Sequence, residues 1–150
     1  MSYQHILVPI DGSDISFSAI QHAANIAKGF GSKVTAISVV SEDPFAAADF
    51  YYTSAMLKDY VVEAIKNAEE SLEKAQQLAQ QQGITIATLV VKNAVSAETI
   101  TTTAEEIHAD LIVMGSHGSK GFQKFFLGSF AQDVLGKTAL PVLIVKGSFN

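Results

Sequence analysis

Residues 6–14 read ILVPIDGSD, and this stretch decides the fold class of the chain. The continuous apolar run at its start is typical of a strand that is buried on both faces, and the Asp-Gly-Ser-Asp at its end is typical of a turn. Residues 16–28 then carry apolar side chains at helical spacing and are followed by glycines at positions 29 and 31. The chain therefore opens with a buried strand, a tight turn and an amphipathic helix.

The same alternation of strand and helix continues to the end of the chain. Apolar runs and helical spacing predict further strands over residues 34–40, 84–91, 111–114 and 142–145 and further helices over residues 57–79, 96–107 and 128–137. Residues 45–56 are left open, because their pattern is equally compatible with a loop that contains a helical turn. Buried strands that alternate with helices predict an α/β fold, in which helices cover both faces of a parallel sheet through right-handed crossovers.

Length and composition predict one globular domain over residues 1–150. The chain is 48% hydrophobic and 17% charged, which is enough apolar surface for a core of its own. It contains no cysteine, which excludes disulfides and thiolate zinc sites. Residues 1–9 lack the basic start of a signal peptide, and no stretch approaches the roughly 20 apolar residues of a membrane span. We therefore expect a cytoplasmic protein without membrane insertion.

Charge limits the possible ligands and partners. The net charge of -5 argues against nucleic-acid binding, which normally requires a basic surface. The ten basic residues are all lysine, so no arginine of this chain is available to clamp a phosphate or to act as an arginine finger. A phosphate site would have to use backbone N–H groups, hydroxyls, lysine or a metal.

The segment most informative about chemistry is residues 115–129, GSHGSKGFQKFFLGS, between a predicted strand and a predicted helix. Glycines allow a backbone to approach an anion and to adopt positive φ, and the N-terminus of a helix favours negative charge. The spacing is neither that of the P-loop nor that of the dinucleotide-binding fingerprint. It nevertheless indicates a phosphate-binding loop.

The pattern G-x2-G-x9-G-S, formed by Gly115, Gly118, Gly128 and Ser129, resembles the nucleotide-binding signature of the universal stress protein family. The blocks 6–13, 109–118 and 140–145 look like that family in the same order. The resemblance implies a single doubly wound, five-stranded parallel sheet of order 3-2-1-4-5, Rossmann-like and similar to the adenine nucleotide alpha hydrolase-like fold. The first and fourth strands then lie side by side at the switch point, where ligands bind in open α/β sheets.

The resemblance also implies a ligand, which is ATP or alternatively ADP or AMP, and the residues that would hold it. Adenine and ribose are expected against Pro9, Ile10, Asp11 and the backbone of Val39, with Met114 and Gly115 beneath them. The phosphates are expected on Gly118, Gly128, Ser129 and Phe130, with Ser116 and His117 completing the loop.

Several of these side chains have a second interpretation. Asp11 could accept the ribose hydroxyls or bind a Mg²⁺ ion held by the phosphates, but an aspartate here is also a common turn former. His117 could act as an acid, a base or a metal ligand, and we interpret it as a loop residue. Lys120 and Lys124 could reach a phosphate or be merely solvated.

The complete glycine pattern favours a regulatory stress-response protein that uses bound ATP as a conformational signal. The alternatives are a slow ATPase and a nucleotide-free dimeric interaction module. Without arginine, and with no second carboxylate assigned near the phosphates, hydrolysis is expected to be slow at most, and no catalytic residue is assigned. Residues 142–145 are expected to form an apolar edge strand, and the resemblance implies that two copies pair antiparallel through it as a homodimer.

Overall fold

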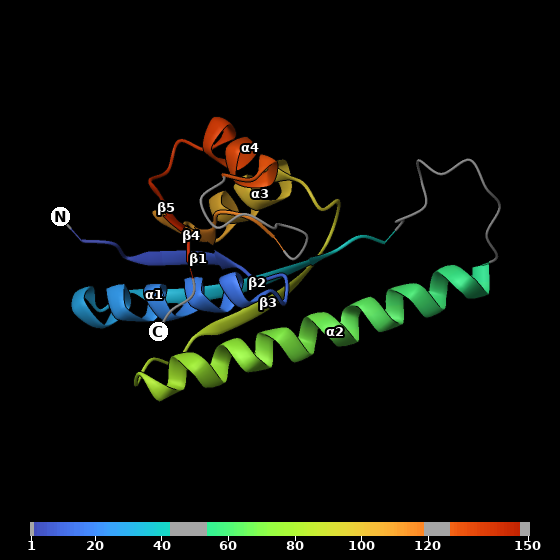
Figure 1. The fold of residues 1–150 in the computed structure, drawn as a ribbon, viewed down its shortest axis with the longest axis horizontal. Coiled ribbons are helices and arrows are strands. Elements are labelled where there is room, and N and C mark those ends of the chain that lie inside the picture. Colours follow the sequence, from blue (N-terminus) through green and yellow to red (C-terminus); the bar gives the residue numbers. More distant parts are fainter. Residues whose placement is uncertain (1, 43–53, 119–126, 148–150) are drawn as a thin grey trace.

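The computed structural model describes residues 2–42, 54–118 and 127–147. Strands and helices alternate along the described chain in the predicted order (Figure 1). Their bounds are β1 His5–Pro9, α1 Asp14–Phe30, β2 Lys33–Val40, α2 Ser54–Gln81, β3 Ala87–Lys92, α3 Ala97–Glu106, β4 Leu111–Gly115, α4 Ser129–Lys137 and β5 Val142–Val145.

The strands form one five-stranded sheet of order β3-β2-β1-β4-β5, and every neighbouring pair is parallel. This confirms the predicted sheet and its strand order. β1 is central, with Ile6 opposite Val34 of β2 on one side and Leu111 of β4 on the other. The central position explains why the run is apolar throughout, since Ile6, Leu7 and Val8 are all 0% exposed.

The sheet separates two apolar cores. Helices α1 and α2 cover one face, and α3 and α4 cover the other (Figure 1). Because successive side chains of a strand point to opposite faces, Ile6 of β1 packs with Ile20 of α1 in one core. The adjacent Leu7 packs with Ile100 of α3 and Val134 of α4 in the other. The two cores hold the strands in place, so that their carboxyl ends form a fixed edge.

Helix starts are set by serine caps. The Ser13 hydroxyl accepts a hydrogen bond from the Ser16 N–H at 3.3 Å at the start of α1. The Ser96 hydroxyl accepts one from the Thr99 N–H, also at 3.3 Å, at the start of α3. Each cap satisfies a backbone donor that has no partner within its own helix, and each lies on a connection that leaves the carboxyl end of a strand.

The third strand begins later than the sequence pattern indicates. The predicted strand started at position 84, whereas β3 spans Ala87–Lys92. Gly83 adopts a φ of 80°, and the Ile84 N–H donates back to the Ala79 carbonyl at 3.0 Å. Ile84 therefore still belongs to the cap that closes α2, and the apolar character of this segment comes from packing before the strand begins.

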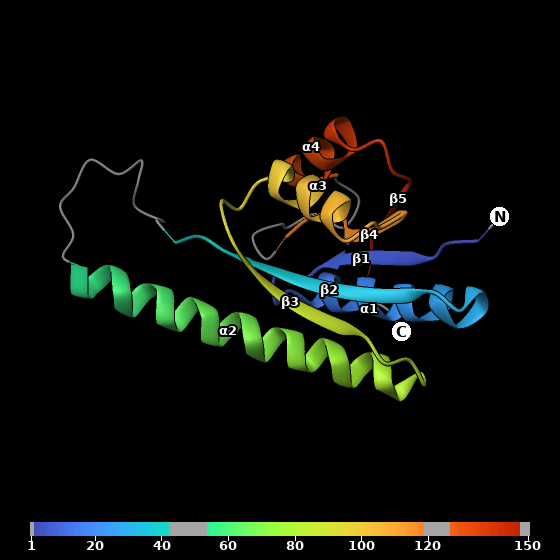
Figure 2. The ribbon, with the colours of Figure 1, turned by 180° about the vertical axis from the view of Figure 1, so that it is seen from behind.

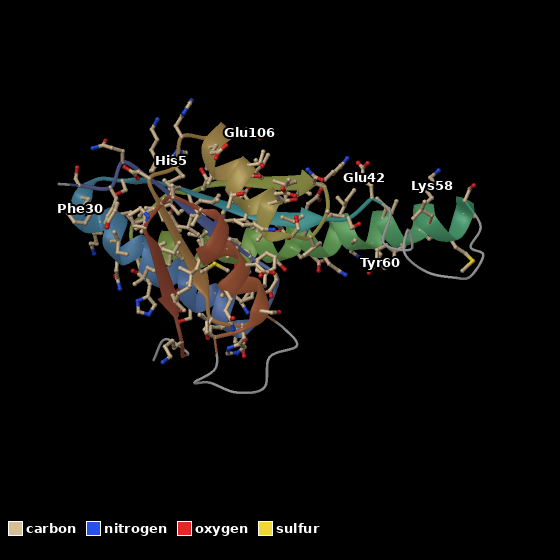
Figure 3. All side chains as sticks on the ribbon, turned by 90° about the horizontal axis from the view of Figure 1, so that it is seen from above. His5, Phe30, Glu42, Lys58, Tyr60 and Glu106 are labelled. Atoms are coloured by element: carbon tan, nitrogen blue, oxygen red, sulfur yellow. The ribbon has the colours of Figure 1, made fainter. Side chains whose placement is uncertain are left out.

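Helix α2 is long, and only its second half is packed. It begins at Ser54, so the last part of the undecided segment 45–56 is helical, and the rest of that segment lies outside the described residues. The buried residues of α2 start at Ala68, and Tyr60 before them is 46% exposed. Figure 3 shows Lys58 and Tyr60 on the part of the helix that extends past the sheet. Further along, the Lys74 ammonium lies 4.3 Å from the centre of the Phe17 ring and joins α2 to α1.

Candidate functional site

A pocket of about 410 Å³ lies at the carboxyl ends of β1, β2 and β4, where the strand order reverses. This is the switch-point position at which open α/β sheets bind ligands. One side of the pocket is formed by α2, and the other by α3 and α4. Figure 2 shows α2 beside β2 and β3, with α3 and α4 on the opposite face of the sheet. The volume of the pocket is within the range of small-molecule sites, which is about 300–1,000 Å³.

The structure brings most of the predicted site residues together in this pocket. The predicted residues that line it are Pro9, Ile10, Asp11, Val39, Met114, Gly115, His117, Gly118 and Phe130. Three predicted residues are not among the described residues that line it, namely Ser116, Gly128 and Ser129. Lys120 and Lys124 lie outside the described residues.

Asp11 makes a turn and faces the glycine loop at the same time. Its Oδ1 accepts hydrogen bonds from the N–H of Ser13, at 2.9 Å, and from the Ser13 hydroxyl. A Cβ added to Gly118 would lie 2.9 Å from Oδ2 of the same carboxylate. Asp11 thus forms the turn, and its carboxylate also lies against the glycine loop.

Ser116 is a structural link between three segments. It is 0% exposed, its N–H donates to the Val145 carbonyl at 2.8 Å, and its carbonyl accepts from the Gly128 N–H at 2.7 Å. Its hydroxyl lies 3.1 Å from Nδ1 of His117. These contacts fasten the end of β4 to β5 and to the start of α4, and they explain why Ser116 lies behind the pocket wall. They also engage the Gly128 N–H within the protein.

The motif glycines are required for space and not for backbone conformation. Gly115, Gly118 and Gly128 do not adopt positive φ, and the described glycines that do are at positions 12, 31 and 83. A Cβ on Gly115 would lie 2.9 Å from Cγ2 of Ile15, and one on Gly128 would lie 3.0 Å from the Ser116 carbonyl oxygen. Two of the three glycines thus allow close packing inside the protein. Gly118, which is exposed, lies against the Asp11 carboxylate.

The N-terminus of α4 faces the same region. Gly128 is its N-cap, and among the described residues no side chain makes a capping hydrogen bond there. Phe130, in the first turn of the helix, lines the pocket. Backbone N–H groups at an uncapped helix start, together with the helix dipole, favour an anion. This end of the pocket is therefore suited to a negatively charged group.

Charged side chains are few among the described residues that line the pocket. The ionisable ones are Asp11, Tyr60 and His117. Within residues 2–42, 54–118 and 127–147, no group of three or more His, Cys, Asp or Glu side chains gathers as a metal site would require. The polarity of the described pocket comes mainly from hydroxyl, amide and backbone groups.

Sequence reasoning missed one complete wall of the pocket. Tyr60, Ala64, Asn67, Ala68 and Ser71 of α2 all line it. They recur at the spacing of one helix face. From the sequence we predicted only that one face of α2 packs against the core. The signal that could have indicated a pocket wall is that small alanines and polar residues lie next to each other at the edge of that face.

Known proteins resemble this chain over almost its whole length. The model of the universal stress protein family matches residues 2–146. Universal stress protein MJ0531 of Methanocaldococcus jannaschii is 39% identical over 148 residues, which cover 96% of this chain and 82% of that protein. Universal stress protein UspA from Lactobacillus plantarum is 25% identical with a TM-score of 0.81, and the match covers 97% of this chain and 99% of that one. The crystal structure of a universal stress protein in complex with cAMP is 25% identical with a TM-score of 0.67, covering 97% and 98% of the two chains.

Proposed function

The chain belongs to the universal stress protein family, and from this premise we propose that it is a regulatory stress-response protein that binds an adenine nucleotide in the switch-point pocket. The observation that carries the proposal is the joint position of Asp11, Gly118 and the N-terminus of α4 around one cavity of about 410 Å³. A related protein of known structure holds cAMP, an adenine nucleotide, which supports this class of ligand.

The two ends of the pocket suggest the orientation of the ligand. The phosphates would lie at Gly118 and at the start of α4, where the helix end favours negative charge. Adenine and ribose would lie against Pro9, Ile10 and Val39, which are mainly apolar. ATP is the ligand we favour, with ADP and AMP as the alternatives.

Asp11 is the residue we assign to the sugar and the metal. Its carboxylate lies beside Gly118 and would accept a ribose hydroxyl or bind a Mg²⁺ ion carried by the phosphates. Mg²⁺ commonly keeps several waters and takes only one or two protein carboxylates, so a single aspartate is sufficient. The metal would supply the positive charge that the described lining residues lack.

We assign the nucleotide a signalling role and expect hydrolysis to be slow at most. Phosphoryl transfer requires a positioned base and neutralisation of charge at the phosphates. His117 lines the pocket, but its Nδ1 lies 3.1 Å from the Ser116 hydroxyl, and this contact supports a role in shaping the loop. No residue is assigned to catalysis.

We also propose a cytoplasmic homodimer that pairs through the edge strand β5. Val142 and Ile144 pack into the core beside α3 and α4, whereas Leu143 is 39% exposed on the outer strand of the sheet. An exposed apolar edge is normally paired or covered. None of the helices in the described part of the chain is both long and apolar enough to cross a membrane.

The test of nucleotide binding is Gly118→Val. The added side chain would start 2.9 Å from Oδ2 of Asp11 and extend toward the position proposed for the phosphates. We expect isothermal titration calorimetry to show loss of ATP binding while the thermal unfolding midpoint stays close to that of the wild type. The matched control is Gly147→Val, because among the described residues no atom beyond the chain neighbours lies within 4 Å of a Cβ at Gly147. Unchanged ATP affinity in a folded Gly118→Val variant would show that the assigned site is wrong, and a wild type that binds no adenine nucleotide would favour the interaction-module alternative.

A further inference from the structure

The wall of the pocket formed by β2 and α2 carries three neutral polar side chains, Ser38, Asn67 and Ser71, which we call the polar wall. Asn67 and Ser71 are one helical turn apart on α2. Ser38 is in phase with Val34 and Ala36, whose side chains pack in the core under α1 and α2, so its hydroxyl is on the side of the sheet that α2 covers. The polar wall thus joins a strand to the helix above it.

The hydrogen-bonding capacity of the polar wall is not used within the described protein. No hydrogen bond joins the side chain of Ser38, Asn67 or Ser71 to another described residue, and Asn67 is exposed at the open side of the wall. Ser38 as a residue is only 7% exposed. Among the described residues, however, the one fully buried polar side-chain atom without a hydrogen-bond partner is Oε1 of Gln82, so the unpartnered Ser38 hydroxyl is not fully buried. The Ser38 hydroxyl is therefore reached from the pocket. Few polar groups in a mainly apolar pocket are the usual means by which a site fixes the orientation and identity of its ligand.

The strand order places the polar wall at the end of the pocket away from the phosphates. β2 and β4 flank β1 on opposite sides, so Ser38 on β2 and Gly118 after β4 are separated by the end of β1. Oγ of Ser71 would be 3.2 Å from a Cβ on Gly12, which puts it beside the turn that follows β1. A nucleotide with its phosphates at Gly118 would accordingly bring its base to the polar wall.

The chemistry of the polar wall fits a base and not a phosphate. It offers hydroxyls and one amide, and no positive charge. We propose that Asn67, with Ser38 and Ser71 beside it, recognises the edge of the adenine base and makes the pocket prefer adenine to guanine nucleotides; this inference rests on the proposed nucleotide-binding function. An amide provides one acceptor and donors side by side, which match the 6-amino group and N7 of adenine. At the same positions guanine presents two acceptors, which can use only the NH₂ group of the amide.

The test compares ATP with GTP on Asn67→Ala. Wild-type protein should bind ATP more tightly than GTP, and truncation of the amide should lower the ratio of the two affinities about tenfold, the size expected for one bidentate base contact. Adenosine should lose affinity in parallel with ATP, because it contains the same base without phosphates. Affinity for inorganic tripolyphosphate should not change. Gln76→Ala is the matched control, since it removes an exposed amide of the same helix that does not line the pocket.

Each of the other outcomes overturns the inference in a distinguishable way. If the wild type binds ATP and Asn67→Ala keeps the same ratio of ATP to GTP affinity, Asn67 does not select the base, and the proposed function stands. If Asn67→Ala weakens ATP, GTP and tripolyphosphate equally, the residue supports the pocket without reading the base. If the wild type binds no adenine nucleotide, both the inference and the proposed function fail.

Discussion

Replacing Gly115 by alanine should destabilise the fold through a specific packing conflict. The new Cβ would lie 2.9 Å from Cγ2 and 3.2 Å from Cγ1 of Ile15, and 3.2 Å from the carbonyl oxygen of His117. Ile15 of α1 is 6% exposed and lies in the hydrophobic core. The His117 carbonyl belongs to the backbone of the loop after β4, so neither neighbour moves freely. Overpacking of this kind typically costs about 1–3 kcal/mol of the free energy of unfolding.

The measurement is thermal unfolding followed by circular dichroism. For a chain of this size each kcal/mol lowers the midpoint by about 2–4 °C, so a cost of about 1–3 kcal/mol should lower the unfolding temperature of Gly115→Ala by about 2–12 °C. Gly29→Ala is the matched control, because Gly29 lies within α1 and, apart from the neighbouring backbone of α1, no atom of the described residues comes within 4 Å of a Cβ there. Alanine has the higher helix propensity, so the control should raise stability by about 0.5–1 kcal/mol. The same Gly→Ala substitution should thus lower the free energy of unfolding at position 115 and raise it at position 29.

The contact with Ile15 can be tested separately by a double-mutant cycle. In an Ile15→Ala background the branched side chain is gone, and adding Gly115→Ala should cost little more than the remaining contact with the His117 carbonyl. An unchanged midpoint for Gly115→Ala alone, or a cost that is the same in both backgrounds, would refute close packing against Ile15 as the reason for this glycine.

Two further predictions concern assembly and chemistry. Leu143→Lys should convert the proposed dimer to a monomer in light scattering without loss of the fold, because Leu143 is exposed on β5 whereas Val142 and Ile144 also serve the core; an intact dimer would place the interface elsewhere. Single-turnover hydrolysis of ATP with Mg²⁺ at saturating protein should be far slower than the roughly 10 s⁻¹ median of enzymes, and a rate near that median, abolished by His117→Ala or Asp11→Asn, would instead make one of these residues catalytic.

The fold could be predicted from the sequence because its strongest signals are local and agree with one another. The apolar run at positions 6–8 is continuous because β1 is central and covered on both faces. The serines at positions 13 and 96 mark helix starts and do cap them. The strand order itself came from the resemblance of three separated blocks to one family, since periodicity alone does not order strands in a sheet.

The candidate site could be predicted from the sequence at the strand ends and, through the family resemblance, at Phe130 of α4, but not along α2. Asp11 and Gly118 come directly after buried strands, so the switch-point rule brings them to one edge. Asn67 and Ser71 lie within a long helix, where polar residues beside a core stripe ordinarily face water. Whether such a face meets solvent or a pocket depends on how α2 lies across the ends of β1 and β2, and this is a tertiary property that no local pattern contains.

The central position of β1 has a consequence for the order in which the chain can complete its fold during synthesis. β1, β2 and β3 are adjacent in both sequence and sheet, so they can assemble once residue 92 is available, whereas the other side of β1 stays open until β4, residues 111–115, arrives to pair with it. The pocket needs both stages, because Asp11 belongs to the early part and Gly118 to the late part. A ligand that requires both would stabilise only the finished sheet, so its binding energy would favour the native state over every shorter or partly assembled form. Occupancy would then report the completion of the domain as well as the concentration of the ligand.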